Sequence, residues 1–390
     1  MFSDRTNWRL AQNRFTQAIE EARARGANLL DLTASNPTRV GLRYNAAEII
    51  SAFGSPHVLD YDPQAKGLLS AREAVAAYYR DEHQVGDLDA ERIVLTTSTS
   101  EGYSFVFRLL CNAGDELLVP KPSYPLFEFL ADLQDVKLVP YPLIYDHGWQ
   151  MDFPSLENAV TPRTRGVVIV HPNNPTGSYV QATEVTPLNA FCRSHGLALI
   201  VDEVFLDYCL DEKPHASFAA NGDALTFTLS GLSKISALPQ MKVAWVATSG
   251  PSAEAAEATA RLEVIADTYL SMNAPIQSAM PALLGQRKNI QRQLLERVHA
   301  NLAELDRQLA QQKNCQRLSV DGGWYAVLRV PVTRSDEDLA IELVREKSVM
   351  VHPGHFYDFP SDGHLVLSLI TKEEEFSTGT TRLIQLLASS

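Results

Sequence analysis

One lysine in this sequence stands where lysines are uncommon. Lys234 lies in residues 229–238, Leu-Ser-Gly-Leu-Ser-Lys-Ile-Ser-Ala-Leu, among small and apolar residues, whereas lysine side chains are usually solvated. A lysine amine whose pKa is lowered can attack an aldehyde and form a Schiff base. Lys234 is therefore a candidate nucleophile, and the alternative is an ordinary lysine in a surface loop.

Two other polar residues follow segments that we expect to be buried strands. Asp202 comes directly after the apolar run 197–201, and open α/β sheets bind ligands at the carboxyl ends of such strands. Asn174 lies in residues 171–177, His-Pro-Asn-Asn-Pro-Thr-Gly, where proline and glycine predict a fixed loop. On position alone, Asp202 could equally cap a helix or loop, and residues 171–177 could be a plain turn.

A run of hydroxyl residues, Thr-Thr-Ser-Thr-Ser-Glu-Gly at positions 96–102, follows another predicted strand and precedes a predicted helix. Hydroxyl groups, backbone N–H groups and the positive end of the helix dipole together bind anions such as phosphate. Simple N-capping of the helix by serine or threonine is the alternative. This region contains no glycine-rich nucleotide-binding motif.

Together, these residues meet the needs of one cofactor. A phosphate needs hydroxyl groups and a helix N-terminus, a pyridinium nitrogen needs a carboxylate, and an aldehyde needs a lysine amine. Pyridoxal phosphate combines all three groups. A metal site is not expected, because the four cysteines (Cys111, Cys192, Cys209 and Cys315) are scattered and form no Cys-x-x-Cys pair.

The order and spacing of these motifs resemble those of the class I and II aminotransferases, which are pyridoxal-phosphate enzymes of fold type I. Asn174-Pro-Thr-Gly comes first, Asp202-Glu-Val begins 28 residues later, and Ser233-Lys234 begins 31 residues after Asp202. The matches span residues 31–370. The resemblance implies an α/β fold with a mostly parallel central sheet, helices on both of its faces and a smaller α+β domain.

The resemblance also implies roles for individual residues. Lys234 would hold the cofactor as an internal aldimine and later carry the proton between Cα and C4′. Asp202 would pair with the pyridine nitrogen, Asn174 would hydrogen-bond the ring oxygen O3′, and Tyr124 would stack on the ring face. The implied phosphate contacts are Thr99, Ser100, Ser233 and Lys242, joined by Tyr61 of a neighbouring subunit. A homodimer is therefore implied.

Four positions depart from the family pattern. Lys242 replaces the usual arginine eight residues after the lysine and loses its two-pronged hydrogen bonding, and Gln240 replaces a common glycine. Phe205 replaces a tyrosine and cannot donate a hydrogen bond to O3′. Val366 replaces the arginine that grips the substrate α-carboxylate as a bidentate pair.

Without that arginine, the carboxylate needs another cation. The candidates are Arg39, Arg43, Lys66, His352 and His355, each of which is otherwise an ordinary surface residue. The residues that we predict as substrate contacts are Ser35, Arg39 and Lys66. Four aromatic residues either line the substrate pocket or belong to the core: Trp324, Tyr325, Phe356 and Tyr357.

The predicted function is a pyridoxal-phosphate-dependent aminotransferase that moves an amino group between an amino acid and a 2-oxo acid. The missing arginine keeps an alternative open, a lyase or decarboxylase that uses the same cofactor on an amino acid or amine. A remote alternative is a non-catalytic regulatory or binding protein. Such regulators usually carry a DNA-binding domain before the aminotransferase-like part, and only about 30 residues precede Asp31.

These residues need a scaffold that brings strand ends together. Apolar segments predict strands at 92–96, 116–119, 137–139, 166–170, 197–201, 225–229, 243–247, 324–330 and 365–370. Helices are expected over 5–25, 68–82, 101–111, 277–312 and 336–347. Runs that are apolar throughout suit parallel strands covered on both faces. The expected large α/β domain is 45–275, and the small domain combines 1–44 with 276–390.

Composition excludes some partners. The net charge of −13 and the pI near 5.3 argue against binding to nucleic acid or to an anionic membrane. No apolar run approaches the roughly 20 residues of a membrane span, and the N-terminus has no signal-peptide pattern. The scattered cysteines make a reducing cytoplasm the expected setting.

Overall fold

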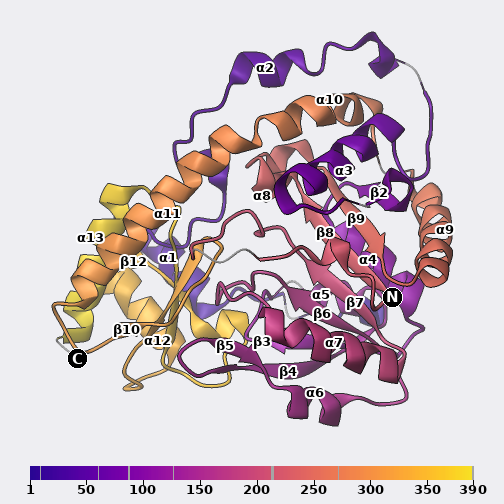
Figure 1. Ribbon diagram of the computed structural model, residues 1–390. Coiled ribbons are helices and arrows are strands. Elements are labelled where there is room, and N and C mark those ends of the chain that lie inside the picture. The colour runs from indigo at the N-terminus through magenta and orange to yellow at the C-terminus, as the bar shows by residue number, and fades with distance from the viewer. Residues whose placement is uncertain are drawn as a thin grey trace.

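The computed structural model describes residues 1–8, 10–59, 61–86, 88–125, 127–211, 215–270 and 272–388, which form three sheets and the helices around them (Figure 1). The strands are β1 (Leu30–Asp31), β2 (Ile93–Thr96), β3 (Glu116–Lys121), β4 (Lys137–Tyr145), β5 (Trp149–Met151), β6 (Thr164–Val170), β7 (Ala198–Asp202), β8 (Thr226–Gly231), β9 (Ala244–Ser249), β10 (Gln316–Arg317), β11 (Tyr325–Arg329), β12 (Val349–Met350), β13 (His352–Pro353) and β14 (His364–Ser368). The α-helices are α1 (Arg14–Ala24), α2 (Ala46–Ser51), α3 (Leu69–His83), α4 (Thr99–Leu110), α5 (Phe127–Asp132), α6 (Phe153–Ala159), α7 (Ala182–His195), α8 (Leu232–Ile235), α9 (Ser252–Tyr269), α10 (Ala274–Gly285), α11 (Arg287–Leu309), α12 (Asp336–Glu342) and α13 (Glu373–Ala388).

The central sheet has the strand order β2-β9-β8-β7-β6-β3-β4-β5. The pairs from β8 to β4 are parallel, whereas β9 and β5 run antiparallel to their neighbours. Val168 and Ile200 pack with α4 and α9 on one face, and Val167 and Leu199 pack with α6 and α7 on the other. Successive strand residues thus enter opposite cores, which explains the unbroken apolar runs and confirms the predicted fold class.

A second, smaller unit combines both ends of the chain. Its antiparallel sheet has the order β10-β11-β14-β13, and β1 pairs in parallel with β12, with Leu30 opposite Val349. Helix α1 packs against α12, and Figure 1 shows it among the C-terminal elements. The domain limits near residues 45 and 275 stay a prediction. Helix α10 begins at the second limit and packs against α3, on the side of the central sheet.

Two helices differ from the sequence prediction in their limits. The first begins at Arg14, because Asn13 caps it by accepting a hydrogen bond from the Thr16 N–H at 2.7 Å. The helix expected over 277–312 is in fact two helices, α10 and α11, which are separated at Gln286. Among the helices of the described residues, none combines the length and the apolar composition needed to cross a membrane.

Candidate active site

The carboxyl ends of the central strands border a cavity of about 530 Å³. Eight of the twelve predicted site residues line it: Ser35, Thr99, Ser100, Tyr124, Asn174, Asp202, Ser233 and Lys234. Apart from Ser35, which lies in the N-terminal loop, they come from the ends of β2, β3, β6, β7 and β8 or from the segments directly after them. The fold therefore brings residues of separate sequence motifs to the edge of the sheet where α/β proteins bind ligands.

Lys234 lies on α8, the short helix directly after β8. A Cβ atom on Gly231, at this junction, would come within 2.7 Å of a backbone oxygen ahead of β9, so the close approach requires glycine. The amine Nζ lies 5.4 Å from the centre of the Phe205 ring and 4.9 Å from that of Trp324. Burial lowers the pKa of Lys234 to about 8, although the charge of Asp202 acts against this shift. About half of the amine is then neutral and nucleophilic at pH 8.

Asp202 is the last residue of β7 and faces the same cavity. Its carboxylate accepts hydrogen bonds from the Val204 N–H at 3.0 Å and from the Tyr103 hydroxyl at 3.1 Å. Burial raises the pKa of Asp202 to about 6, and these two hydrogen bonds and Lys234 act in the opposite direction. The carboxylate is thus ionised at neutral pH but poorly solvated, so a cationic ligand group beside it would stabilise it.

Tyr103 is a site residue that the sequence analysis missed. It lies on α4 one turn after Thr99, and residues four apart share one face of a helix. The position of the hydroxyl run at the start of α4 was the signal that could have identified it. Its hydroxyl fixes the orientation of the Asp202 carboxylate.

The N-terminus of α4 provides an anion site at the edge of the cavity. Ser98 caps the helix by accepting a hydrogen bond from the Glu101 N–H at 3.2 Å. The next residues, Thr99 and Ser100, present hydroxyl groups and first-turn N–H groups, which have no partner within a helix. Ser233 adds a third hydroxyl residue from α8. These donors and the helix dipole suit a phosphate.

Asn174 contributes an amide to the cavity that lacks a protein partner. Its Oδ1 atom is buried and has no hydrogen bond within the described residues. The loop around it is fixed, because Asn173 donates hydrogen bonds to the Pro122 carbonyl at 3.0 Å and to the Thr176 hydroxyl at 2.9 Å. A buried polar atom without a partner costs about 1–3 kcal/mol. A ligand group that donates a hydrogen bond to Oδ1 would remove that cost.

The cavity residues fit the cofactor that the sequence predicts. The α4 N-terminus suits the phosphate of pyridoxal phosphate, Asp202 its ring nitrogen, and Lys234 its aldehyde. The amide nitrogen of Asn174 can donate a hydrogen bond to the ring oxygen, and Tyr124 offers an aromatic face. Phe205 lines the cavity as well and brings no hydrogen-bond donor.

Four predicted site residues are not among the described lining residues of the cavity. Lys66 pairs with Glu91, with 2.6 Å between Nζ and Oε2, and its predicted contact with substrate stays a prediction. Arg39 and Lys242 have exposed side chains. Tyr61 is 83% exposed and borders a separate opening. The roles given to Arg39, Lys242 and Tyr61 stay predictions.

Of the four aromatic residues that either line the pocket or belong to the core, three line the cavity and one lies in the core. Tyr325, Phe356 and Tyr357 line the cavity. Trp324 is fully buried in the core of the smaller unit, and its ring still reaches the Lys234 amine. The lining of the cavity is therefore rich in aromatic side chains.

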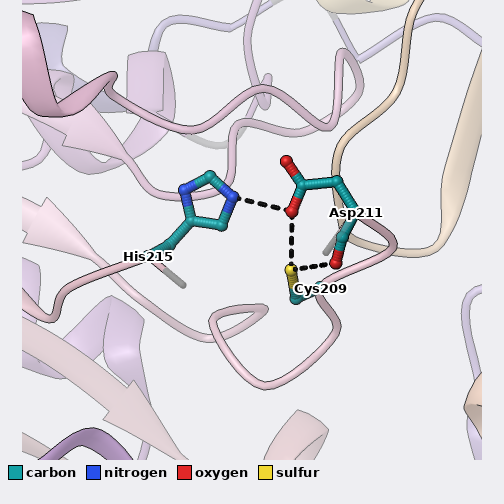
Figure 2. Close-up of side chains that lie close together, drawn as sticks. All are labelled: Cys209, Asp211 and His215. Carbon is teal, nitrogen blue, oxygen red and sulfur yellow. Dashed lines mark hydrogen bonds and ion pairs between the residues drawn. The ribbon is translucent and has the colours of Figure 1, made fainter. Parts of the chain in front are cut away.

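A second group of polar side chains lies outside the cavity, in the chain after β7 (Figure 2). Asp211 Oδ1 lies 3.0 Å from the Cys209 thiol and 3.0 Å from His215 Nε2. Burial and the Asp211 carboxylate raise the pKa of the Cys209 thiol to about 12. Cys209 is therefore a protonated hydrogen-bond donor at neutral pH.

Comparisons with known proteins give the family and the fold of the chain. A family model described as "Aminotransferase class I and II" matches residues 9–375. An alanine aminotransferase of Mycobacterium bovis is 29% identical over 94% of this chain and 87% of its own length. The glutamate-pyruvate aminotransferase AlaA of Escherichia coli is 25% identical over 93% of this chain and 91% of its own length. A solved alanine aminotransferase from Pyrococcus furiosus has the same fold, with a TM-score of 0.91 at 20% identity and complete coverage of both chains.

Proposed function

The chain belongs to the class I and II aminotransferases, and from this premise we propose that its substrates are the pairs alanine–pyruvate and glutamate–2-oxoglutarate. Aminotransferase activity with pyridoxal phosphate follows from the family, and the lyase and decarboxylase alternative has no support. The substrate pairs rest on the named activities of relatives at 29% and 25% identity. The observation that carries the assignment of the site is that Lys234 and Asp202 face one cavity.

The cavity residues have separate tasks in this proposal. When bound, pyridoxal phosphate supplies an aldehyde that takes up the amino group and a ring that accepts electron density from the substrate Cα. The Lys234 amine, with its pKa near 8, takes a proton from Cα and returns one at neutral pH. The Asp202 carboxylate favours a positive charge on the ring nitrogen. The α4 N-terminus holds the phosphate, and Asn174 orients the ring.

A single-turnover assay with one amino acid at a time tests the substrate pairs. We expect the holoenzyme to convert alanine to pyruvate, and glutamate to 2-oxoglutarate, up to one equivalent per active site. Ammonia and carbon dioxide should stay at the level of a Lys234→Ala control, because the amino group remains with the enzyme. Pyruvate and ammonia released together from serine, which can lose its Cβ hydroxyl as water, would indicate a lyase instead, and carbon dioxide released from any amino acid would indicate a decarboxylase. If the enzyme converts other amino acids but neither alanine nor glutamate, the proposed substrate pairs are wrong.

A homodimer is part of the proposal, with Tyr61 reaching the phosphate of the neighbouring subunit. Tyr61 does not line the cavity of its own chain, and it is 83% exposed. Leu59 and Leu270 are exposed beside it at the same opening. Exposed apolar side chains that gather at one place are typical of protein interfaces. Leu59, Tyr61 and Leu270 therefore support a subunit interface at this opening.

Removal of the Tyr61 hydroxyl tests the shared site. In Tyr61→Phe, the ring and its packing remain, but the hydrogen bond to the phosphate is lost. A hydrogen bond to a charged group contributes about 1.5–3 kcal/mol, so the Kd for pyridoxal phosphate should rise about 10- to 100-fold. Light scattering should still give the mass of a dimer. An unchanged Kd, or a monomeric wild-type protein, would contradict the proposal.

The cytoplasmic setting also stays a prediction. Among the described residues, the four cysteines form no disulfide, which is usual for proteins of reducing compartments. Their pKa values are raised by burial, to about 12 for Cys111 and Cys192 and to about 11 for Cys315.

A further inference from the structure

The position of the missing arginine lies at the substrate side of the cavity. Val366 is in β14, where it pairs with Val327 on one side and with His352 on the other. Residues directly opposite each other in antiparallel strands project from the same face of the sheet. His352 lines the cavity, and so does Tyr325, which shares the face of Val327. The face that carries Val366 is thus the one toward the cavity, and its side chain is apolar.

Few basic groups are available to replace that arginine. Among the described lining residues of the cavity, the basic ones are Lys234 and His352. Lys234 is committed to the cofactor aldehyde in the proposed function. Arg39 is exposed outside the lining, and the Lys66 amine is paired with Glu91. His352 is left as the basic side chain next to the position of the missing arginine.

We propose that His352 receives the α-carboxylate of the amino-acid substrate, by donating a hydrogen bond from Nε2 while Tyr357 holds its other nitrogen. This inference deepens the proposed function and rests on it. The chemical class that the residue recognises is a carboxylate one bond away from the reacting Cα. A side chain that does so sets specificity for amino acids over plain amines.

The surroundings of His352 fix its ring for this task. Nδ1 lies 3.0 Å from the Tyr357 hydroxyl, and Tyr357 is itself a buried lining residue. The rings of Phe356 and Tyr357 pack against the imidazole with 5.8 Å between centroids. When the phenol donates to Nδ1, the imidazole proton is on Nε2, for which the described residues provide no hydrogen-bond partner. Nε2 is thus free to donate to a ligand.

The imidazole is a weaker carboxylate ligand than the arginine that it replaces. Burial lowers the pKa of His352 to about 4, although the nearby Asp31 carboxylate acts against the shift. The ring is therefore neutral before substrate arrives, and it offers one N–H group instead of a charged fork. We expect the enzyme to discriminate between amino acids and amines about 10- to 30-fold, toward the lower end of the contribution of one hydrogen bond to a charged group.

Two amines that cannot lose a Cα proton isolate this contact from chemistry. They are 2-methylalanine, which carries the carboxylate, and tert-butylamine, which has a methyl group in its place. The Kd of each is measured by titrating the absorbance of the bound cofactor in wild-type holoenzyme, His352→Phe and His352→Gln. The matched control is His355→Phe, because His355 is three residues away, exposed and not among the described lining residues.

The wild type should bind 2-methylalanine about 10- to 30-fold more tightly than tert-butylamine. His352→Phe should remove this difference by weakening 2-methylalanine alone, and His352→Gln, which keeps an N–H donor, should restore part of it. His355→Phe should behave as the wild type. Equal weakening of both ligands, or an undiminished preference in His352→Phe, would overturn the proposal. If the preference depends on His352 but alanine and glutamate are not transaminated, the substrate pairs are wrong and the carboxylate contact stands.

Discussion

Replacing Lys234 with alanine should lower the rate of amino-group transfer by at least about 10⁴-fold. In the proposed function, the variant loses both the amine that would anchor the cofactor and the group that would move the proton at Cα. Proton transfer by a positioned side chain alone contributes up to about 10⁴-fold, which corresponds to about 5.5 kcal/mol of activation free energy. Initial rates of pyruvate formation from alanine, with pyridoxal phosphate in excess, measure the loss.

Covalent retention of the cofactor provides an independent measurement. After borohydride reduction and denaturation, the wild type should keep the cofactor mass on the peptide that contains Lys234, and Lys234→Ala should not. Lys288→Ala is a suitable control, because the side chain of Lys288 is 71% exposed on α11, pairs with Glu82 and has no part in the proposed function. Cofactor found on another lysine in the wild type would refute the assignment of Lys234.

Replacing Asp202 with asparagine should cost about 10²–10³-fold in kcat. The substitution keeps the shape of the side chain and an oxygen that can accept from the Val204 N–H, but it removes the charge opposite the ring nitrogen. Removal of one preorganised electrostatic group typically has an effect of this size. The residual activity of Asp202→Asn should therefore exceed that of Lys234→Ala.

Asp202→Asn should also lower the pKa of Lys234. The charge of Asp202 raises the pKa of Lys234, against the larger effect of burial. Without that charge the pKa of Lys234 should fall below about 8, so the apoenzyme should bind pyridoxal phosphate at lower pH than the wild type. The pH dependence of the association rate measures this shift. Glu203→Gln is the control, because Glu203 is a buried acid that bonds to Ser217 and Phe218 and does not line the cavity. A pH dependence that does not move in Asp202→Asn would contradict the proposed pairing of these charges.

Much of the site was predictable because each residue follows its own strand. Lys234, Asp202 and Asn174 come after three different apolar segments, and the carboxyl ends of parallel strands meet at one edge. Chain order was therefore enough to place them together. The same reasoning predicts the mostly parallel sheet, but it does not show that β9 runs antiparallel between β2 and β8.

Pairings between distant residues could not be read from the chain in the same way. Nothing around Lys66 indicates that its partner is Glu91, 25 residues away. The placement of His352 beside Val366 depends on the register of two short strands, which the intervening loop determines. Such contacts decide which cations face the cavity, so the cofactor could be predicted from the sequence, whereas the proposal for the carboxylate contact needed the structure.

The pairing of β1 with β12 has a consequence for the synthesis of the chain. Leu30 meets Val349 only after more than three hundred further residues have been made, and Ser35 depends on Ser368, whose hydroxyl donates to the carbonyl of Ala34 at 2.5 Å. The cofactor residues up to Lys234 leave the ribosome more than a hundred residues before His352. We therefore expect the nascent protein to pass through a stage in which its central sheet can form while the apolar side chains of α1, such as Phe15 and Ile19, are still unpaired. Chaperones recognise exposed apolar surface of this kind. The N-terminal segment would expose such surface until the C-terminal elements that it packs against have been made.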